Sequence, residues 1–346
     1  MENGRLLGAL KIAVLIPCYN EEASIQKVVA DYKASLPEAT VYVYDNNSQD
    51  RTVILARSGG AIVRSETLQG KGNVVRRMFA DVDADAYVLV DGDDTYDAEA
   101  ATGMLWTLVD QQLDMVTGVR ANVGTNAYRL GHHWGNKVLT GLVRFTFGKR
   151  VTDVLSGYRV FSRRFVKSFP ALATGFETET EFTVHALELG MPIAEISTKY
   201  RSRLIGSVSK LRTFSDGLRI LAMIVRLIKE ERPLHFFSIA GLGLLAAGVT
   251  MSVPIFAEFA RSGTVPRLPT AVLSTGLVLL AFLSLGCGLI LDSVARGRKE
   301  LKRLAYLAVP SIISSQVVSA DPIGQRDPAL VAARSHALHN LVPGKR

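Results

Sequence analysis

Apolar residues in the N-terminal part of the chain follow two alternating patterns. Short runs of consecutive apolar residues, typical of buried strands, alternate with stretches in which apolar residues recur every three or four positions, as on a helix face. The predicted strands are 12–17, 41–44, 61–64, 86–90 and 115–118, and the predicted helices are 25–36, 74–82 and 98–113. We expect Asn20 to cap the first helix. This alternation predicts an α/β fold with a doubly wound, mainly parallel sheet.

Two much longer apolar runs follow in the C-terminal part. Residues 234–257 and 268–291 contain no Asp, Glu, Lys or Arg. Each run is long enough to cross a hydrocarbon core of about 30 Å as a helix. A buried core helix is the alternative, although such helices are usually shorter and carry a polar face. The sequence therefore predicts a two-helix transmembrane hairpin.

Basic residues on both sides of this hairpin set its expected orientation. They are Arg219, Arg226, Lys229 and Arg232 before it, and Arg296, Arg298, Lys299, Lys302 and Arg303 after it, whereas the connection carries only Arg261 and Arg267. The positive-inside rule places the connection outside and both termini, with the N-terminal domain, in the cytoplasm. We therefore expect a multi-pass protein of the cytoplasmic membrane.

Composition and charge agree with this division. The chain is 48% hydrophobic, with a mean hydropathy of +0.20, which is high for a purely soluble protein. Basic residues beside anionic lipid account for the net charge of +8, so no nucleic-acid partner is expected. We divide the chain into a cytosolic domain (1–211), a juxtamembrane amphipathic helix (212–233), the hairpin (234–292) and a basic segment with a disordered tail (293–346).

Three carboxylates follow the strand 86–90, and they are Asp91, Asp93 and Asp94. Divalent cations prefer carboxylate oxygens, and ligands of α/β sheets bind beyond the carboxyl ends of strands. An EF-hand loop is excluded because Tyr96 occupies its glycine position and a strand precedes it. A solvated turn that caps the helix near Asp97 is the other interpretation. The strand end is therefore a candidate site for a metal-bound phosphate.

Two more polar clusters, 17–22 and 45–52, should open onto the same edge of the sheet as 91–95. Carboxylate and amide side chains there suit the base and ribose of a nucleotide, although Asp45 could be only a turn residue. The segment 69–73 has neither P-loop nor dinucleotide-fingerprint spacing. We expect its glycines to let the chain approach a ligand, with Lys71 near the phosphates.

Several motifs occur in order within residues 10–232, and they are Pro17-Cys-Tyr-Asn-Glu-Glu22, Asp45-Asn-Asn-Ser-Gln-Asp-Arg-Thr52, Gly70-Lys-Gly72, Asp91-Gly-Asp93 and Ser156-Gly-Tyr-Arg159. In this order they resemble the inverting family 2 glycosyltransferases of GT-A (nucleotide-diphospho-sugar transferase) fold. The nearest group looks like the polyprenyl-phosphate glycosyltransferases. The resemblance implies a GT-A domain, then interfacial helices, then the membrane hairpin.

The resemblance also implies roles for the residues that match these motifs. The donor's base and ribose would be held by Pro17, Tyr19, Asn20, Glu21 and Asp45. Asp91 and Asp93 would bind Mg²⁺ or Mn²⁺, and Thr95 stands where a further metal contact is often Gln. Asp93 would thereby take part in catalysis.

The acceptor side is assigned in the same way. Arg120 and Arg129 are candidates for phosphates, and Asp153 stands next to the acceptor as a possible base. Ser156 is a further candidate for contact with the acceptor or the diphosphate. A basic loop with Arg201, Arg203, Ser209 and Lys210 would close over donor and lipid phosphate, although these charges could equally face the membrane. A lipid monophosphate is already largely anionic at neutral pH, so Asp153 would orient the acceptor or a cation more plausibly than act as a strong base. His132 and His133 lack a metal-binding partner and are interpreted as structural.

The expected reaction moves a hexose, glucose or mannose, from a UDP- or GDP-sugar to a polyprenyl phosphate in cell-envelope glycan biosynthesis. One alternative is a membrane-anchored glycosyltransferase with a glycolipid or polysaccharide acceptor. Another is a non-catalytic membrane scaffold, which the acidic cluster disfavours. We also expect self-association, because hairpin-anchored members of the family suggest it.

Overall fold

The computed structural model describes residues 10–121, 141, 151–201, 229 and 232–312. Several predictions concern residues outside this part of the chain, namely Arg129, His132, His133, Arg203, Ser209, Lys210, most of the amphipathic helix and the tail after residue 312. These remain predictions.

A seven-stranded sheet forms the centre of the N-terminal domain. Its strands are β1 (Ile12–Cys18), β2 (Thr40–Asp45), β3 (Ile62–Ser65), β4 (Ala86–Leu89), β5 (Met115–Ala121), β6 (Arg159–Ser162) and β7 (Ile193–Lys199). They follow the order β3-β2-β1-β4-β6-β5-β7, and β6 is antiparallel to both neighbours while the other pairs are parallel. The predicted α/β class with a mainly parallel sheet is confirmed.

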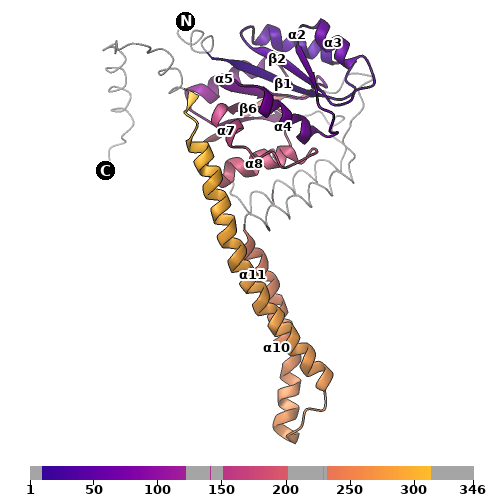
Figure 1. Ribbon diagram of the computed structural model, residues 1–346, viewed down its shortest axis with the longest axis vertical. Coiled ribbons are helices and arrows are strands. Elements are labelled where there is room, and N and C mark those ends of the chain that lie inside the picture. Colours follow the sequence, from indigo (N-terminus) through magenta and orange to yellow (C-terminus); the bar gives the residue numbers. More distant parts are fainter. Residues whose placement is uncertain (1–9, 122–140, 142–150, 202–228, 230–231, 313–346) are drawn as a thin grey trace, which may run out of the picture.

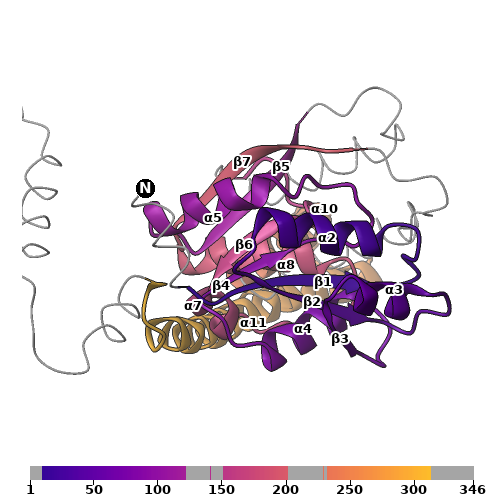
Figure 2. The same cartoon turned by 90° about the horizontal axis from the view of Figure 1, so that it is seen from above.

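Helices cover both faces of this sheet (Figure 2). They are α2 (Ile25–Ser35), α3 (Thr52–Ser58), α4 (Lys71–Asp81), α5 (Ala100–Asp110), α7 (Arg163–Ser168) and α8 (Thr178–Leu189). One buried core lies beneath α2, α3 and α5, and a second lies between the sheet and α4, α7 and α8. The domain therefore has three layers, with the sheet buried on both sides.

The expected cap of α2 is wrong. The helix begins after Ser24, whose side chain makes no capping hydrogen bond. Asn20 instead has a left-handed backbone with φ of 52°, and its Oδ1 accepts a hydrogen bond from the Gln49 backbone at 2.8 Å. Asn20 thus joins two loops at the edge of the sheet.

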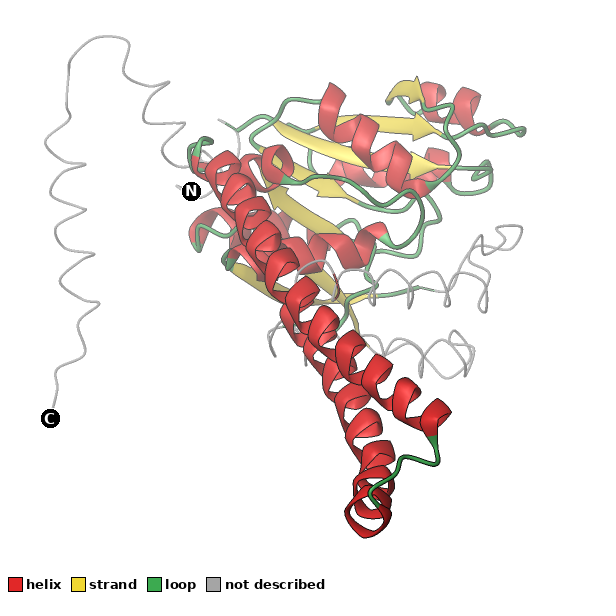
Figure 3. Cartoon of the chain, turned by 60° about the horizontal axis from the view of Figure 1, so that its bottom comes forward, coloured by secondary structure: helices red, strands yellow, loops and turns green. Residues whose placement is uncertain are grey.

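The C-terminal helices α10 (Pro233–Ser262) and α11 (Leu268–Leu307) form a long antiparallel hairpin that extends away from the domain (Figures 1 and 3). Both are long and apolar enough to cross a membrane, and only 17% and 11% of their most apolar windows are buried. They are therefore not core helices of a soluble domain. The basic segment expected from residue 293 onward is helical and continues α11 as far as Leu307.

Small residues line the contact between the two helices at seven-residue intervals. They are Gly241 and Gly248 on α10, and Ser274, Ala281 and Gly288 on α11, all buried. A Cβ atom at Gly248 would lie 2.9 Å from Val278 Cγ2 and 3.0 Å from the Ser274 carbonyl oxygen. Such a seam lets two backbones approach closely without a hydrophobic driving force.

Polar bonds attach the far end of α11 to the domain. Lys302 Nζ lies 2.8 Å from Glu188 Oε2, and the Tyr306 hydroxyl donates to Asp114 Oδ2 at 2.8 Å. Asp114 is completely buried, and the Arg164 guanidinium lies 4.8 Å from the centre of the Tyr306 ring. The hairpin and the domain are therefore in direct contact through charged and aromatic side chains.

The glycine seam yields a prediction. Gly248→Leu should force α10 away from α11 and reduce stability by about 1–3 kcal/mol, because the added side chain has no space. The measurement is the thermal unfolding of the full chain in detergent. Gly243→Leu is the matched control, since nothing lies within 4 Å of a Cβ at that glycine. Equal destabilisation by both changes would contradict the packing seam.

Candidate active site

The carboxyl ends of β1, β2 and β4 meet at one edge of the sheet because these strands are parallel neighbours. The Asn20 backbone donates to Ser48 Oγ at 2.8 Å, and the Glu21 backbone donates to Thr52 Oγ1 at 2.8 Å. Ser24 Oγ donates to the Gly92 carbonyl at 2.6 Å. The structure therefore brings the three polar clusters together, as the strand pattern predicts.

Acidic side chains converge around the buried Cys18 thiol at this edge. Burial raises the pKa of Cys18 well above its ordinary value, and nearby negative charges raise it further. These charges belong to Glu21, Asp45, Asp91 and Asp93. The edge thus concentrates negative charge, which suits a cation far better than an unaccompanied anion.

Lys71 supplies a buried positive charge to this edge. Its Nζ lies 2.5 Å from Asp91 Oδ1 and 2.5 Å from Glu179 Oε1. Burial alone would lower the pKa of Lys71, but the charges of Asp91 and Glu179 outweigh it and raise the pKa. Burial raises the pKa of Glu179 in spite of Lys71. Among the described residues, Glu179 Oε2 has no hydrogen-bond partner.

The glycines beside Lys71 pack against the protein's own backbone, and their expected approach to a ligand stays a prediction. A Cβ atom at Gly70 or Gly72 would overlap the backbone of residues 173–174, and the Gly72 N–H donates to the Thr174 carbonyl at 3.1 Å. Gly70 also has φ of 129°, which other residues rarely adopt. The close approach in the structure is therefore to the protein's own backbone, and it starts α4 where Lys71 reaches Asp91.

Asp93, Asp94 and Thr95 differ in their surroundings although they are adjacent. Thr95 Oγ1 donates to Asp93 Oδ1 at 2.6 Å, so this hydroxyl orients the carboxylate. Asp94 has a left-handed backbone and pairs with Lys27 at 2.9 Å. Asp94 is therefore a turn residue, and the role of Thr95 as a metal ligand remains a prediction.

The carboxylates Asp91 and Asp93 fit one class of metal site. Among the described residues, no group of three or more His, Cys, Asp or Glu is arranged to hold a metal ion by itself. Mg²⁺ usually binds through one or two carboxylates together with substrate phosphates and waters. Two carboxylates beyond one strand therefore match a cation shared with a diphosphate, and they do not match a closed structural site.

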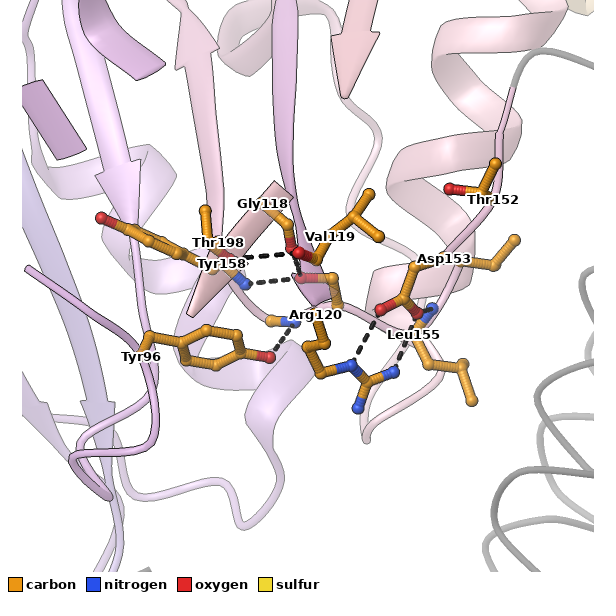
Figure 4. A network of polar contacts seen from close by, with 12 residues as sticks. Tyr96, Gly118, Val119, Arg120, Thr152, Asp153, Leu155, Tyr158 and Thr198 are labelled. Atoms are coloured by element: carbon orange, nitrogen blue, oxygen red, sulfur yellow. Dashed lines mark hydrogen bonds and ion pairs between the residues drawn. The ribbon is translucent and has the colours of Figure 1, made fainter. Parts of the chain in front are cut away.

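Arg120 and Asp153 form a bidentate pair at the end of β5 (Figure 4). Arg120 Nε and Nη2 donate to the two Asp153 oxygens, both at 2.8 Å. The guanidinium also lies 5.7 Å from the centre of the Tyr200 ring. Because both Asp153 oxygens face a cation, Asp153 has the geometry of a residue that orients Arg120.

The Ser156-Gly-Tyr-Arg159 motif packs against Asp91 on the inner side of the site. Ser156 is completely buried and donates to the Gly118 carbonyl at 2.5 Å, so its expected contact with an acceptor has no support in this position. The Gly157 N–H donates to the Tyr96 hydroxyl at 3.0 Å. A Cβ atom at Gly157 would overlap the Asp91 carboxylate. The motif therefore supports the site from beneath.

Arg159 is an internal support that the sequence analysis left without a role. It is completely buried, and burial lowers its pKa to about 10. Its guanidinium donates to the carbonyls of Ser156 at 3.1 Å and Val154 at 2.8 Å, and to Thr183 Oγ1 at 3.0 Å. It thus fixes the loop that carries Asp153. An arginine directly before the apolar pair Val160-Phe161 was the available signal.

The remaining predicted residues lie at the same edge or next to it. Arg201 Nη2 lies 3.1 Å from Asp97 Oδ1, and its backbone N–H donates to the Thr95 carbonyl at 2.8 Å. Asp45 accepts hydrogen bonds from the Ser48 backbone at 3.2 and 3.3 Å, which is turn geometry. Pro17 is the next-to-last residue of β1, and Tyr19 is exposed. Their proposed contacts with a donor remain predictions.

The fold and site are those of a GT-A type sugar transferase. The sheet is mainly parallel, carboxylates lie beyond its strand ends with Lys71 beside them, and the Arg120–Asp153 pair lies at the end of β5. The family model described as "Glycosyl transferase family 2" matches residues 13–169. Glycosyltransferase AglJ from Haloferax volcanii is 31% identical over 86% of this chain and 98% of that protein. The chain belongs to glycosyl transferase family 2 and is a glycosyltransferase.

Other relatives agree with this assignment, and a solved structure shares the fold. A dolichyl-phosphate hexose transferase from Haloferax volcanii is 31% identical over 64% of this chain and 95% of that protein. A dodecaprenyl-phosphate galacturonate synthase from Rhizobium johnstonii is 24% identical over 83% of this chain and 88% of that protein. Glucosyl-3-phosphoglycerate synthase from Mycobacterium tuberculosis, in complex with Mn²⁺, UDP and glucosyl-3-phosphoglycerate, has a TM-score of 0.55 and 22% identity over 65% of this chain and 82% of that chain. The likeness to this structure confirms the fold.

The buried pairing of Lys71 yields a prediction. Lys71→Met should lower the free energy of unfolding by about 3–5 kcal/mol, because it leaves the buried Glu179 carboxylate and Asp91 without their cation. Unfolding of the full chain in detergent measures this. Lys27→Met, at a lysine that is 46% exposed and also pairs with two carboxylates, is the control and should cost less than about 1 kcal/mol. Adding Glu179→Gln to Lys71→Met should restore part of the loss, and no restoration would argue against the pairing.

Proposed function

We propose that this glycosyltransferase moves a hexose from a UDP- or GDP-sugar to a polyprenyl phosphate at the cytoplasmic face of a membrane. The observation that carries the proposal is the union of two features in one chain. Asp91, Asp93 and Arg120 lie at one edge of the domain, and α11 joins this domain to an apolar hairpin through Lys302 and Tyr306. Relatives named for dolichyl-phosphate and dodecaprenyl-phosphate substrates support the acceptor class.

The proposed reaction is a single displacement at the sugar C1 atom. An oxygen of the acceptor phosphate forms a bond to C1 while the bond from C1 to the nucleoside diphosphate breaks, with inversion. The main cost is the negative charge that accumulates on the leaving diphosphate. A divalent cation bound by Asp91 and Asp93 would supply Lewis-acid stabilisation of this charge.

Protein cations would share this task. Lys71 already lies beside Asp91, so a diphosphate that reaches this carboxylate through a metal would come near the ammonium group. Arg120 would offset the repulsion between an anionic acceptor and an anionic donor, and Asp153 would keep its guanidinium fork in a fixed orientation. The acceptor phosphate needs little deprotonation at neutral pH, so the arrangement requires no strong base.

The hairpin would place this chemistry beside its acceptor. A polyprenyl phosphate keeps its phosphate at the membrane surface, and the apolar run of α11 ends at Leu291, before the helix contacts the domain. The basic residues that flank the two spans favour the cytoplasmic side for the domain.

The carboxylate pair is tested by transfer of labelled glucose and mannose from UDP-glucose and GDP-mannose into extractable membrane lipid. Asp91→Asn should reduce transfer at least about a hundredfold, since the loss of one group that helps to stabilise the charge of the transition state costs that much in comparable sites. Asp94→Asn is the matched control in the same loop and should retain activity within about threefold, because Asp94 pairs with Lys27. Full activity of Asp91→Asn would refute the site. Label in a polymer and not in lipid would favour a polysaccharide acceptor.

The two roles open to Asp153 predict different kinetics. If Asp153 orients Arg120, Asp153→Asn should raise the KM for the lipid phosphate about tenfold. The fall of kcat at low pH, the acid limb of its pH profile, should then remain as in the wild type. Loss of that limb, with a fall in kcat alone, would identify Asp153 as the base. Thr152→Ala serves as the control, since this neighbour bonds Glu195 and not Arg120.

A further inference from the structure

A second polar cavity lies where the C-terminal end of α8 meets α11 and the residue before α10. Its volume is about 180 Å³, and its walls include Glu188, Arg232, Asp292, Arg296 and Lys299. A cavity of this size holds several water molecules. A hydrated phosphate group therefore fits in it.

The charges around this cavity do not cancel. Arg296 pairs with Asp292 at 3.2 Å, and Glu188 pairs with Lys302 at 2.8 Å. In the part of the chain that the structure describes, Arg232 and Lys299 have no ion-pair partner. These two side chains come from opposite sides of the hairpin, and together they give the cavity an excess of positive charge that an anion would neutralise.

The cavity lies at the height of a membrane surface if the hairpin spans a bilayer. Arg232 is the residue immediately before α10, and the apolar run of α11 ends at Leu291, one residue before Asp292. Both walls therefore stand at the boundary between apolar and charged sequence. Basic pockets at this depth on the cytoplasmic side are suited to anionic lipid head groups.

This cavity is separate from the candidate active site. Glu179, which pairs with Lys71, lies at the start of α8, and Glu188 lies near its end. Nine residues of helix place them about 13 Å apart along the axis. An anion bound beside Glu188 would therefore not occupy the place of the donor or of Asp91.

We propose that this cavity binds the phosphate head group of an anionic membrane phospholipid, in addition to any lipid that serves as acceptor. Arg232 and Lys299 contact the phosphate, and the Arg296–Asp292 pair forms the wall beside it. The lipid thereby links the start of α10 to the cytoplasmic part of α11. The inference rests on the membrane placement in the proposed function and not on the proposed reaction.

The test uses the full chain in zwitterionic detergent, titrated with phosphatidylglycerol or phosphatidylcholine while thermal unfolding is followed. Phosphatidylglycerol should raise the melting temperature in a saturable way, and phosphatidylcholine should not. Arg232→Gln with Lys299→Gln should weaken phosphatidylglycerol binding about tenfold or more. Arg298→Gln with Arg303→Gln removes the same charge from α11 outside the cavity and should change binding less than threefold.

Two further measurements separate the alternatives. Arg232→Lys with Lys299→Arg preserves both charges and should retain most of the binding, which controls for misfolding of the glutamine variant. Inorganic phosphate at matched concentration should give no comparable shift. Equal weakening in both charge-removing pairs, or an equal shift with inorganic phosphate, would overturn the lipid site. Lipid binding without sugar transfer would count against the proposed function alone.

Discussion

The candidate active site depends on one constraint, which is that several carboxylates must stay close together at a largely buried edge. Such charges repel one another strongly where water is excluded. Lys71 relieves this by lying between Asp91 and Glu179, 2.5 Å from each. Three glycines give the backbone the space that this pairing needs. Gly70 and Gly72 let α4 begin against residues 173–174, and Gly157 leaves room for the Asp91 carboxylate.

Much of this arrangement could be predicted from local sequence patterns. The strands that end in polar clusters are visible as apolar runs, and parallel pairing then brings Asn20, Asp45 and Asp91 to one edge. The pairing of Lys71 with Glu179 could not be predicted, because no local pattern connects residues so far apart in the chain. The short strand β6 was also missed, since it is only four residues long and begins with a buried arginine whose charge is satisfied only by tertiary contacts.

Burial separates residues that look equivalent in the sequence. Arg120 and Arg159 are both arginines at strand ends. Arg159 donates only to groups inside the domain, including two carbonyls and the Thr183 hydroxyl, whereas Arg120 lies at the edge and pairs with Asp153. Ser156 faces inward in the same way. Motif matching therefore finds the neighbourhood of a site, while the division between supporting and contacting residues requires the packed structure.

The continuity of α11 has a mechanical consequence. Its 40 residues form one helix about 60 Å long, of which the apolar run takes up about 36 Å. The remaining part of this helix, about 24 Å long and called here the post, lies beside the domain. Lys302 and Tyr306 bond its C-terminal part to the domain. In the proposed membrane placement, this post works as a spacer that holds the domain at a constant height and tilt. An acceptor must then bring its phosphate to that fixed level, so the enzyme selects substrates by reach as well as by charge.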